Sequence, residues 1–324
     1  MKNLFDIKRT KMIDELAFEH NPMSFGKTFL AFFILTLISS VATNSITNTP
    51  IMINFIIAEI KNGTFESLTD TLIKFMEAPY VSIPWWVILI QLFGGIFAII
   101  AVTVYMKKFE KRKMRSIGLR RGAPLEIILG ALIGAALIGV MFLSTFLSGA
   151  ISYTFAGIDL RILLFALGFG VLAFGEELLV RGFFMNMLAR DIKPMAAILT
   201  SAILSAIAGF SVYNIPSFIN TVLFGILLGI YVFKRGSIWG AVAIRFVWSF
   251  VSASILGTNV FGSYAVLSVF VPKYNASSLI GGSSAYGFEA GLIMTAVLAV
   301  AILLSLLLKT KKSEESFVKI DYFK

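Results

Sequence analysis

Long apolar segments recur along this chain of 324 residues, and they restrict its fold more than any other feature. A helix needs about 20 mostly apolar residues to cross a bilayer, and only helices or closed barrels pair all their backbone polar groups in lipid. Hydrophobic residues make up 58% of the chain, charged residues make up 14%, and the mean hydropathy is +0.88. A soluble domain carries about 25% charged residues. The sequence therefore predicts an all-α, polytopic membrane helix bundle with about eight transmembrane helices.

The predicted spans are separated by turns, charged runs and polar loops. We expect them at about residues 28–42, 85–106, 125–148, 161–180, 196–212, 217–233, 238–256 and 288–308. After the first span, an apolar run from Ile51 and an amphipathic stretch ending at Pro79 are expected to form helix on or under the membrane surface. Residues 257–286 are rich in Gly, Ser, Asn and Tyr, and we expect them to form a loop.

Two predicted spans carry glycines four residues apart, Gly130 with Gly134 and Gly225 with Gly229. Small residues at this spacing let two helix backbones approach closely in lipid. We therefore expect each pair to lie at a helix–helix contact.

Most of the 28 Lys and Arg residues lie on one side of the predicted spans, in the N-terminal tail, residues 107–121, the turns after the fourth and sixth spans, and the C-terminal tail. Cytoplasmic loops of membrane proteins carry an excess of these residues. We therefore expect a multi-pass protein of the cell membrane with both termini in the cytoplasm. The run at 107–121 is interpreted as a topology determinant, with binding of anionic lipids as an alternative. Nucleic acid is not expected as a partner.

Residues 174–184 read Phe-Gly-Glu-Glu-Leu-Leu-Val-Arg-Gly-Phe-Phe, which places two carboxylates and a guanidinium in and just after the fourth span. A charge in the middle of a bilayer costs about 3 kcal/mol or more, so such residues usually have partners inside the protein. Glu177 and Arg181 share one helix face, whereas Glu176 points about 100° away toward another element. One interpretation is a structural ion pair that orients the helix, and the other is a functional site.

The side chains that usually bind zinc are almost absent. The chain has no Cys, and its one His is His20 in the N-terminal tail. Structural and catalytic zinc sites are built mostly from Cys and His, with some carboxylates. Disulfides and cysteine chemistry are therefore excluded, and a zinc site has few candidate ligands.

The motif Glu176-Glu177-x-x-x-Arg181, followed by Gly-Phe-Phe, resembles the first motif of the CPBP (Abi) family. This family contains the CAAX prenyl proteases, bacteriocin-processing and bacteriocin-immunity proteins of bacteria, and lysostaphin-resistance-like proteins. Residues 117–120, 224–231 and 235–239 are similar to neighbouring segments of the family. The resemblance covers about residues 117–256, the CAAX-protease-like core. The predicted spans and topology divide the rest into a cytoplasmic N-terminal segment (1–27), N-terminal transmembrane helices with an extracytoplasmic and a basic cytoplasmic loop (28–116), and an outer loop, last transmembrane helix and cytoplasmic tail (257–324).

In active members of this family, the first Glu of the motif activates a water, together with two histidines and an asparagine on two later helices. By resemblance, the first Glu is Glu176. The second motif, Phe-x-x-x-His, falls on Ser205 to Gly209, and the third, His-x-x-x-Asn, falls on Arg245 to Ser249. Both histidines are therefore replaced. His20 precedes the first span and is an implausible substitute.

The resemblance thus implies a protease fold without its metal ligands, since zinc hydrolysis needs about three protein ligands and an open position. We expect a non-catalytic scaffold or partner-binding protein without a cofactor, in contact with membrane lipids and with a protein or peptide partner in the membrane. The alternative is an active intramembrane metalloendopeptidase that processes prenylated or bacteriocin-type peptides. Glu176, Glu177 and Arg181 would then be catalytic and zinc would be required. A carrier of small solutes or lipids is a third interpretation.

Arg245 stands where the family places its third-motif histidine. Without a metal, buried carboxylates need a cationic partner, and a guanidinium can bind a carboxylate through two hydrogen bonds. We therefore predict that Arg245 bridges the seventh span to Glu176 or Glu177. The alternative is that Arg245 pairs elsewhere or lines a wet cavity.

Overall fold

The computed structural model describes residues 24–71, 84–119, 123–209, 214–260, 267–275 and 280–307. Three of the predicted features lie outside these ranges: the N-terminal tail with His20, the end of the predicted surface stretch at Pro79, and the basic C-terminal tail.

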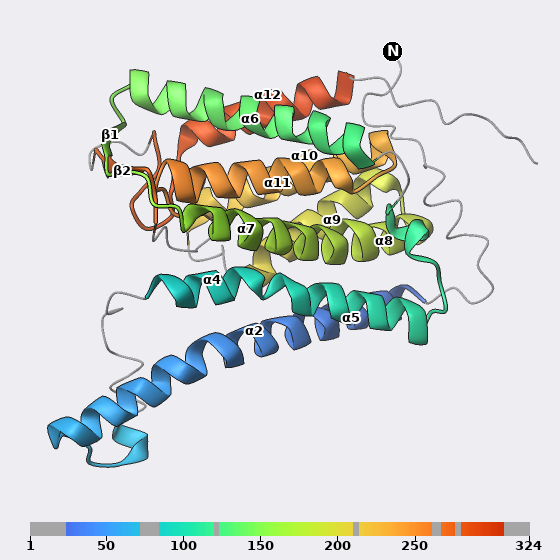
Figure 1. The fold of residues 1–324 in the computed structure, drawn as a ribbon. Coiled ribbons are helices and arrows are strands. Elements are labelled where there is room, and N and C mark those ends of the chain that lie inside the picture. Colours follow the sequence, from blue (N-terminus) through green and yellow to red (C-terminus); the bar gives the residue numbers. More distant parts are fainter. Residues whose placement is uncertain are drawn as a thin grey trace, which may run out of the picture.

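The described chain consists mainly of helices that run roughly side by side (Figure 1). The α-helices are α2 (Phe25–Asn62), α4 (Trp85–Phe93), α5 (Gly95–Lys108), α6 (Ala123–Leu147), α7 (Ile162–Glu177), α8 (Asn186–Asp191), α9 (Pro194–Ala208), α10 (Ile215–Arg235), α11 (Trp239–Phe250) and α12 (Leu292–Leu307). Short 3-10 turns are η1 (Met114–Ile117) and η5 (Phe288–Ala290), and π-helical segments are η2 (Leu178–Met185) and η4 (Val251–Ile255). Helices α6, α10, α11 and α12 lie at one side, α7 lies in the middle, and α4, α5 and then α2 lie at the other side.

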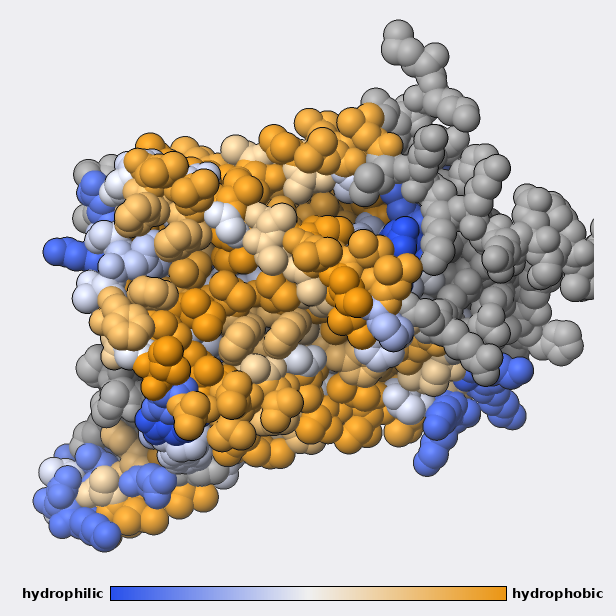
Figure 2. Space-filling model, turned by 45° about the horizontal axis from the view of Figure 1, so that its top comes forward, coloured by the Kyte–Doolittle hydropathy of each residue, from blue (hydrophilic) through white to orange (hydrophobic). Residues whose placement is uncertain are grey.

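The surface of this bundle confirms an all-α membrane protein. Five helical stretches of the described chain are long and apolar enough to cross a membrane, and three shorter apolar helices accompany them. Figure 2 shows a broad hydrophobic band across the middle of one face, with hydrophilic residues gathered toward its two ends. Each predicted span overlaps one of these eight helical stretches, and the number that cross the bilayer stays a prediction.

Helix α2 is longer than predicted. The first span was expected to end at Ala42, but the helix continues without a break to Asn62. The polar side chains of Ser39, Thr43 and Thr47 each donate a hydrogen bond to a backbone carbonyl one turn earlier, at 2.7–2.9 Å. Because these hydroxyls are satisfied within the helix itself, a run of Ser and Thr does not end it.

The predicted loop at 257–286 contains an unpredicted strand. Strand β2 (Phe270–Tyr274) pairs antiparallel with β1 (Ile151–Phe155), with Ile151 opposite Tyr274. Residues along β2 alternate between half-buried and exposed. An alternation over five residues within a Gly-, Ser- and Asn-rich segment is too short to stand out in the sequence, so the prediction of a loop was wrong for this stretch.

The fourth predicted span also continues beyond its expected end at Val180. Helix α7, segment η2 and helix α8 follow one another without interruption from Ile162 to Asp191. All eight residues of η2 are buried, so this part of the chain is surrounded by protein rather than lipid. Segments of π-helix are rare and often occur at functional sites.

Both predicted glycine pairs lie at close helix contacts. A Cβ atom added at Gly130 of α6 would lie 2.2 Å from the carbonyl oxygen of Gly240 on α11. A Cβ atom added at Gly225 of α10 would lie 2.9 Å from the Cβ atom of Ala202 on α9. These contacts hold α11 and α9 in place, and both helices carry residues of the candidate site.

Candidate functional site

The charged motif lies where α7 passes into the π-helical segment η2, in the interior of the bundle. Glu177 is the last residue of α7, and its side chain is fully buried. Arg181 lies in η2 with a side chain that is 1% exposed. The Glu176 side chain, by contrast, is 43% exposed. The two adjacent carboxylates therefore have different surroundings, as their divergence on a helix predicts.

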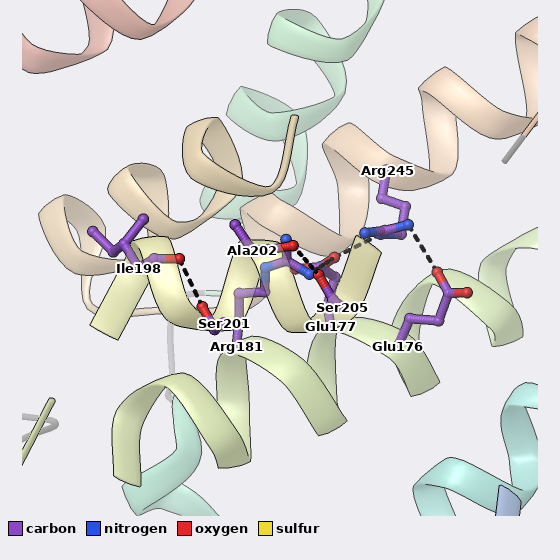
Figure 3. Close-up of polar contacts among 8 residues, drawn as sticks. All are labelled: Glu176, Glu177, Arg181, Ile198, Ser201, Ala202, Ser205 and Arg245. Atoms are coloured by element: carbon purple, nitrogen blue, oxygen red, sulfur yellow. Dashed lines mark hydrogen bonds and ion pairs between the residues drawn. The ribbon is translucent and has the colours of Figure 1, made fainter. Parts of the chain in front are cut away.

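Arg245 on α11 contacts both carboxylates, as Figure 3 shows. Its Nη1 atom lies 2.8 Å from Oε2 of Glu176, and its Nε atom donates a hydrogen bond to Oε1 of Glu177 at 2.6 Å. Arg181 Nη1 donates to the same Oε1 of Glu177 at 3.3 Å. The predicted bridge from Arg245 is confirmed, and Glu177 also pairs with Arg181, with which it shares one helix face. We call these four residues the charge clasp.

The charge clasp contains two acids and two bases, so its formal charges sum to zero. This balance matters because unpaired buried charges cost several kcal/mol each. Its hydrogen bonding is nevertheless incomplete within the described chain: Oε2 of Glu177 and the Nε and Nη2 atoms of Arg181 have no hydrogen-bond partner there. A Cβ atom at Gly225 would lie 3.0 Å from Arg181 Nη2, so this glycine leaves room for the guanidinium.

The charge clasp borders a cavity of about 360 Å³ between α2, α4, α5, α7, η2, α9, α10 and α11. Glu176, Arg181 and Arg245 line it, and so do Ser205 and Gly209, the positions that the resemblance assigns to the second motif. Ser205 Oγ donates a hydrogen bond to the carbonyl of Ala202 at 3.0 Å. Ser249 is buried on α11 and is not among the described residues that line the cavity.

The sequence analysis did not predict that the N-terminal helices form part of the cavity wall. Helix α2 and helix α4 contribute a row of polar side chains: Thr36, Ser39, Ser40, Thr43, Asn44 and Gln91. A usable sign was present in the sequence, because Ser39, Thr43 and Thr47 recur at every fourth residue of an apolar helix, and this spacing aligns them on one face.

The donor set at the clasp does not fit a zinc ion. Gly209 has no side chain to offer, and Arg245 places a cation where the family has a histidine. The guanidinium already binds one oxygen of each carboxylate. Among the residues that the structure describes, no three His, Cys, Asp or Glu side chains are grouped to hold a metal. The residues at the clasp are therefore not suited to hold a metal ion.

The fold and the clasp define a polytopic membrane protein with a largely buried carboxylate–guanidinium site beside a partly open cavity. Comparison with protein-family models adds one finding: residues 158–251 match the type II CAAX prenyl endopeptidase Rce1-like model, and this match supports membership of the CAAX-protease (CPBP) family. The match covers under a third of the chain and includes all four clasp residues. Comparisons with curated proteins and with solved structures found no match.

Proposed function

We propose that this protein is a non-catalytic member of the CAAX-protease-like family. In this proposal it resides in the cell membrane with both termini in the cytoplasm, and it binds a partner instead of cleaving peptide bonds. The observation that carries the proposal is the position of Arg245, whose guanidinium lies within 2.8 Å of Glu176 and 2.6 Å of Glu177.

This contact bears on catalysis because a general base must direct a lone pair at the water that it activates. Arg245 occupies one oxygen of each carboxylate, and it joins α7 to α11 through them. The bridge is well suited to holding two helices together in a fixed geometry. It is poorly suited to binding a cationic metal, which the guanidinium would repel.

The partners that we propose are membrane lipids and a protein or peptide that lies in the membrane. The polar wall of the cavity supports this, because Ser, Thr, Asn and Gln side chains form hydrogen bonds between elements inside a bilayer. The cavity is also large enough for a small ligand, since such sites begin at about 300 Å³.

One observation favours the alternative, an active endopeptidase. Glu176 retains the first-motif position and is 43% exposed beside the cavity, so a water or a peptide could reach it. An enzyme of this kind would depend on Glu176, and it would need a nucleophile or metal from elsewhere in the chain.

The test compares the wild-type protein with Glu176→Gln in lipid nanodiscs. We expect no cleavage of prenylated or unprenylated peptides by either form, with or without added zinc, and no stoichiometric zinc by elemental analysis. Cleavage by the wild type that disappears in Glu176→Gln would overturn the proposal. So would about one zinc per chain that is lost in the same variant.

A further inference from the structure

The charge clasp is built asymmetrically. Glu177 is fully buried and contacts both Arg181 and Arg245, whereas Glu176 is 43% exposed and contacts Arg245 alone among the described partners. Figure 3 shows Glu176 set apart from the other three charged groups, on the far side of the Arg245 guanidinium. Rotating the Glu176 side chain would therefore leave the inner three residues in contact with one another.

The inner three residues carry one negative and two positive charges, which leaves a formal charge of +1. Glu176 supplies the balancing charge in the structure. Because the Glu176 side chain is 43% exposed, solvent can screen part of this charge when the side chain rotates away, and another anion in its place would balance the charge directly. The site thus has room for one exchangeable monoanion.

Donors for such an anion are already in place at the cavity. Arg245 Nη1 is held by Glu176 at 2.8 Å and becomes available when Glu176 rotates away. Arg181 lines the cavity and has two nitrogen atoms without a hydrogen-bond partner in the described chain. Thr36 on the opposite wall has a buried hydroxyl that is likewise unpartnered there. These groups belong to residues on α11, η2 and α2 that line the same cavity.

We propose that this cavity binds a small carboxylate with a short apolar chain, which exchanges with Glu176 for the Arg245 guanidinium. This inference rests on the proposed function, because it treats the site as a binding site and not as a hydrolytic one. A planar guanidinium matches a carboxylate through parallel hydrogen bonds.

The rest of the lining selects against other ligands. A phosphate dianion would leave the site with an extra negative charge, and a cation would meet two guanidinium groups. The apolar chain of the ligand would lie against Leu92, Ala98 and Leu172, which also line the cavity. A cavity of about 360 Å³ is at the small end for ligand sites, so a chain of a few carbons fits better than a long acyl chain.

Hexanoate is a suitable probe, and hexanamide is its matched control because it has the same shape without the charge. The measurement is binding to purified protein in nanodiscs by titration calorimetry, repeated with Glu176→Gln. A tethered competitor acts at an effective concentration of millimolar or above, so its removal should tighten hexanoate binding by about tenfold or more. Hexanamide binding should change little. Equal or weaker hexanoate binding by Glu176→Gln than by the wild type would overturn the inference.

Two further variants test where the ligand binds. Arg245→Gln in the Glu176→Gln background should lose hexanoate binding, because the main donor is gone. Ala208→Leu places a larger side chain in the cavity from α9, and it should abolish the tighter hexanoate binding in the Glu176→Gln background. Retained tight binding in folded Ala208→Leu protein would place the ligand elsewhere and reject the cavity. Peptide cleavage is measured in a separate assay. Observed cleavage would reject the proposed function without changing the hexanoate-binding result.

Discussion

The guanidinium of Arg245 on α11 donates through Nε to Oε1 of Glu177 on α7, at 2.6 Å and across 68 positions of the sequence. The carboxylate has no exposed surface, and the guanidinium side chain is 12% exposed. This pair closes the charge clasp from its inner side. Its strength therefore determines how firmly the two helices are joined beside the cavity.

We expect Arg245→Ala to lower the free energy of unfolding by about 3–5 kcal/mol, because it leaves a buried carboxylate short of one partner. Glu177→Gln should have an effect of similar size, and the double variant should lose less than the sum, with a coupling of about 0.5–3 kcal/mol. Thermal or denaturant unfolding in detergent measures this. Glu176→Gln is the matched control, since its exposed pair should contribute at most about 1 kcal/mol. Strictly additive effects of Arg245→Ala and Glu177→Gln would contradict the clasp.

Gly95 of α5 and Gly175 of α7 let the backbones of the two helices come into contact, and Gly175 immediately precedes Glu176. A Cβ atom at Gly175 would lie 2.4 Å from the carbonyl oxygen of Gly95, which belongs to the backbone and cannot rotate away. We expect Gly175→Ala to destabilise the protein by about 1–3 kcal/mol, as overpacking does. Gly139→Ala on α6 is the control, because nothing lies within 4 Å of its added methyl group. It should be neutral or stabilising, by up to about 1 kcal/mol. Equal melting temperatures for both variants would refute the close contact.

A second buried ion pair, outside the clasp, should also contribute to stability. Glu126 of α6 is 5% exposed in its side chain, and it accepts hydrogen bonds from Arg235 at 2.7 and 2.9 Å and from Tyr231 at 3.0 Å. Glu126→Ala leaves these donors on α10 without their acceptor, which should cost about 1–3 kcal/mol.

The exposed pair of Asp159 with Arg161 offers the matched comparison for Glu126. Asp159→Ala should change stability much less than Glu126→Ala does, because solvent screens an exposed pair. Equal melting temperatures for Glu126→Ala and Asp159→Ala would show that burial does not increase the contribution of the Glu126 pair to stability.

The orientation predicted from the basic residues can be tested with single cysteines, because the chain contains none. Lys113 beside η1 and Ser152 of β1 are both exposed, and these segments lie at opposite ends of the bundle in Figure 1. An impermeant thiol reagent should label Ser152→Cys in intact cells and should label Lys113→Cys only after the membrane is opened. The unmodified chain is the control for background labelling. Labelling of Lys113→Cys in intact cells would reverse the predicted topology. Position 278, in the predicted outer loop, lies outside the described residues.

Much of the fold could be predicted from the sequence because lipid imposes strict requirements on it. Apolar segments must form helices whose backbone groups pair internally, so hydropathy alone located all eight helical stretches. The ends of helices were less well predicted. Residues 43–62 extend α2 because hydroxyl groups can pair with the helix backbone, and this pairing is not visible in hydropathy.

The charged residues of the site were identifiable for the same reason, since Glu176, Glu177, Arg181 and Arg245 are costly in an apolar setting and must have partners. The sequence by itself determined which side chains need partners, and the helical periodicity paired Glu177 with Arg181. Only the tertiary structure decided that Arg245 reaches both carboxylates, and that α2 supplies the polar wall facing them. The physical reason is that contacts between distant helices depend on how their surfaces pack, which local sequence patterns do not specify.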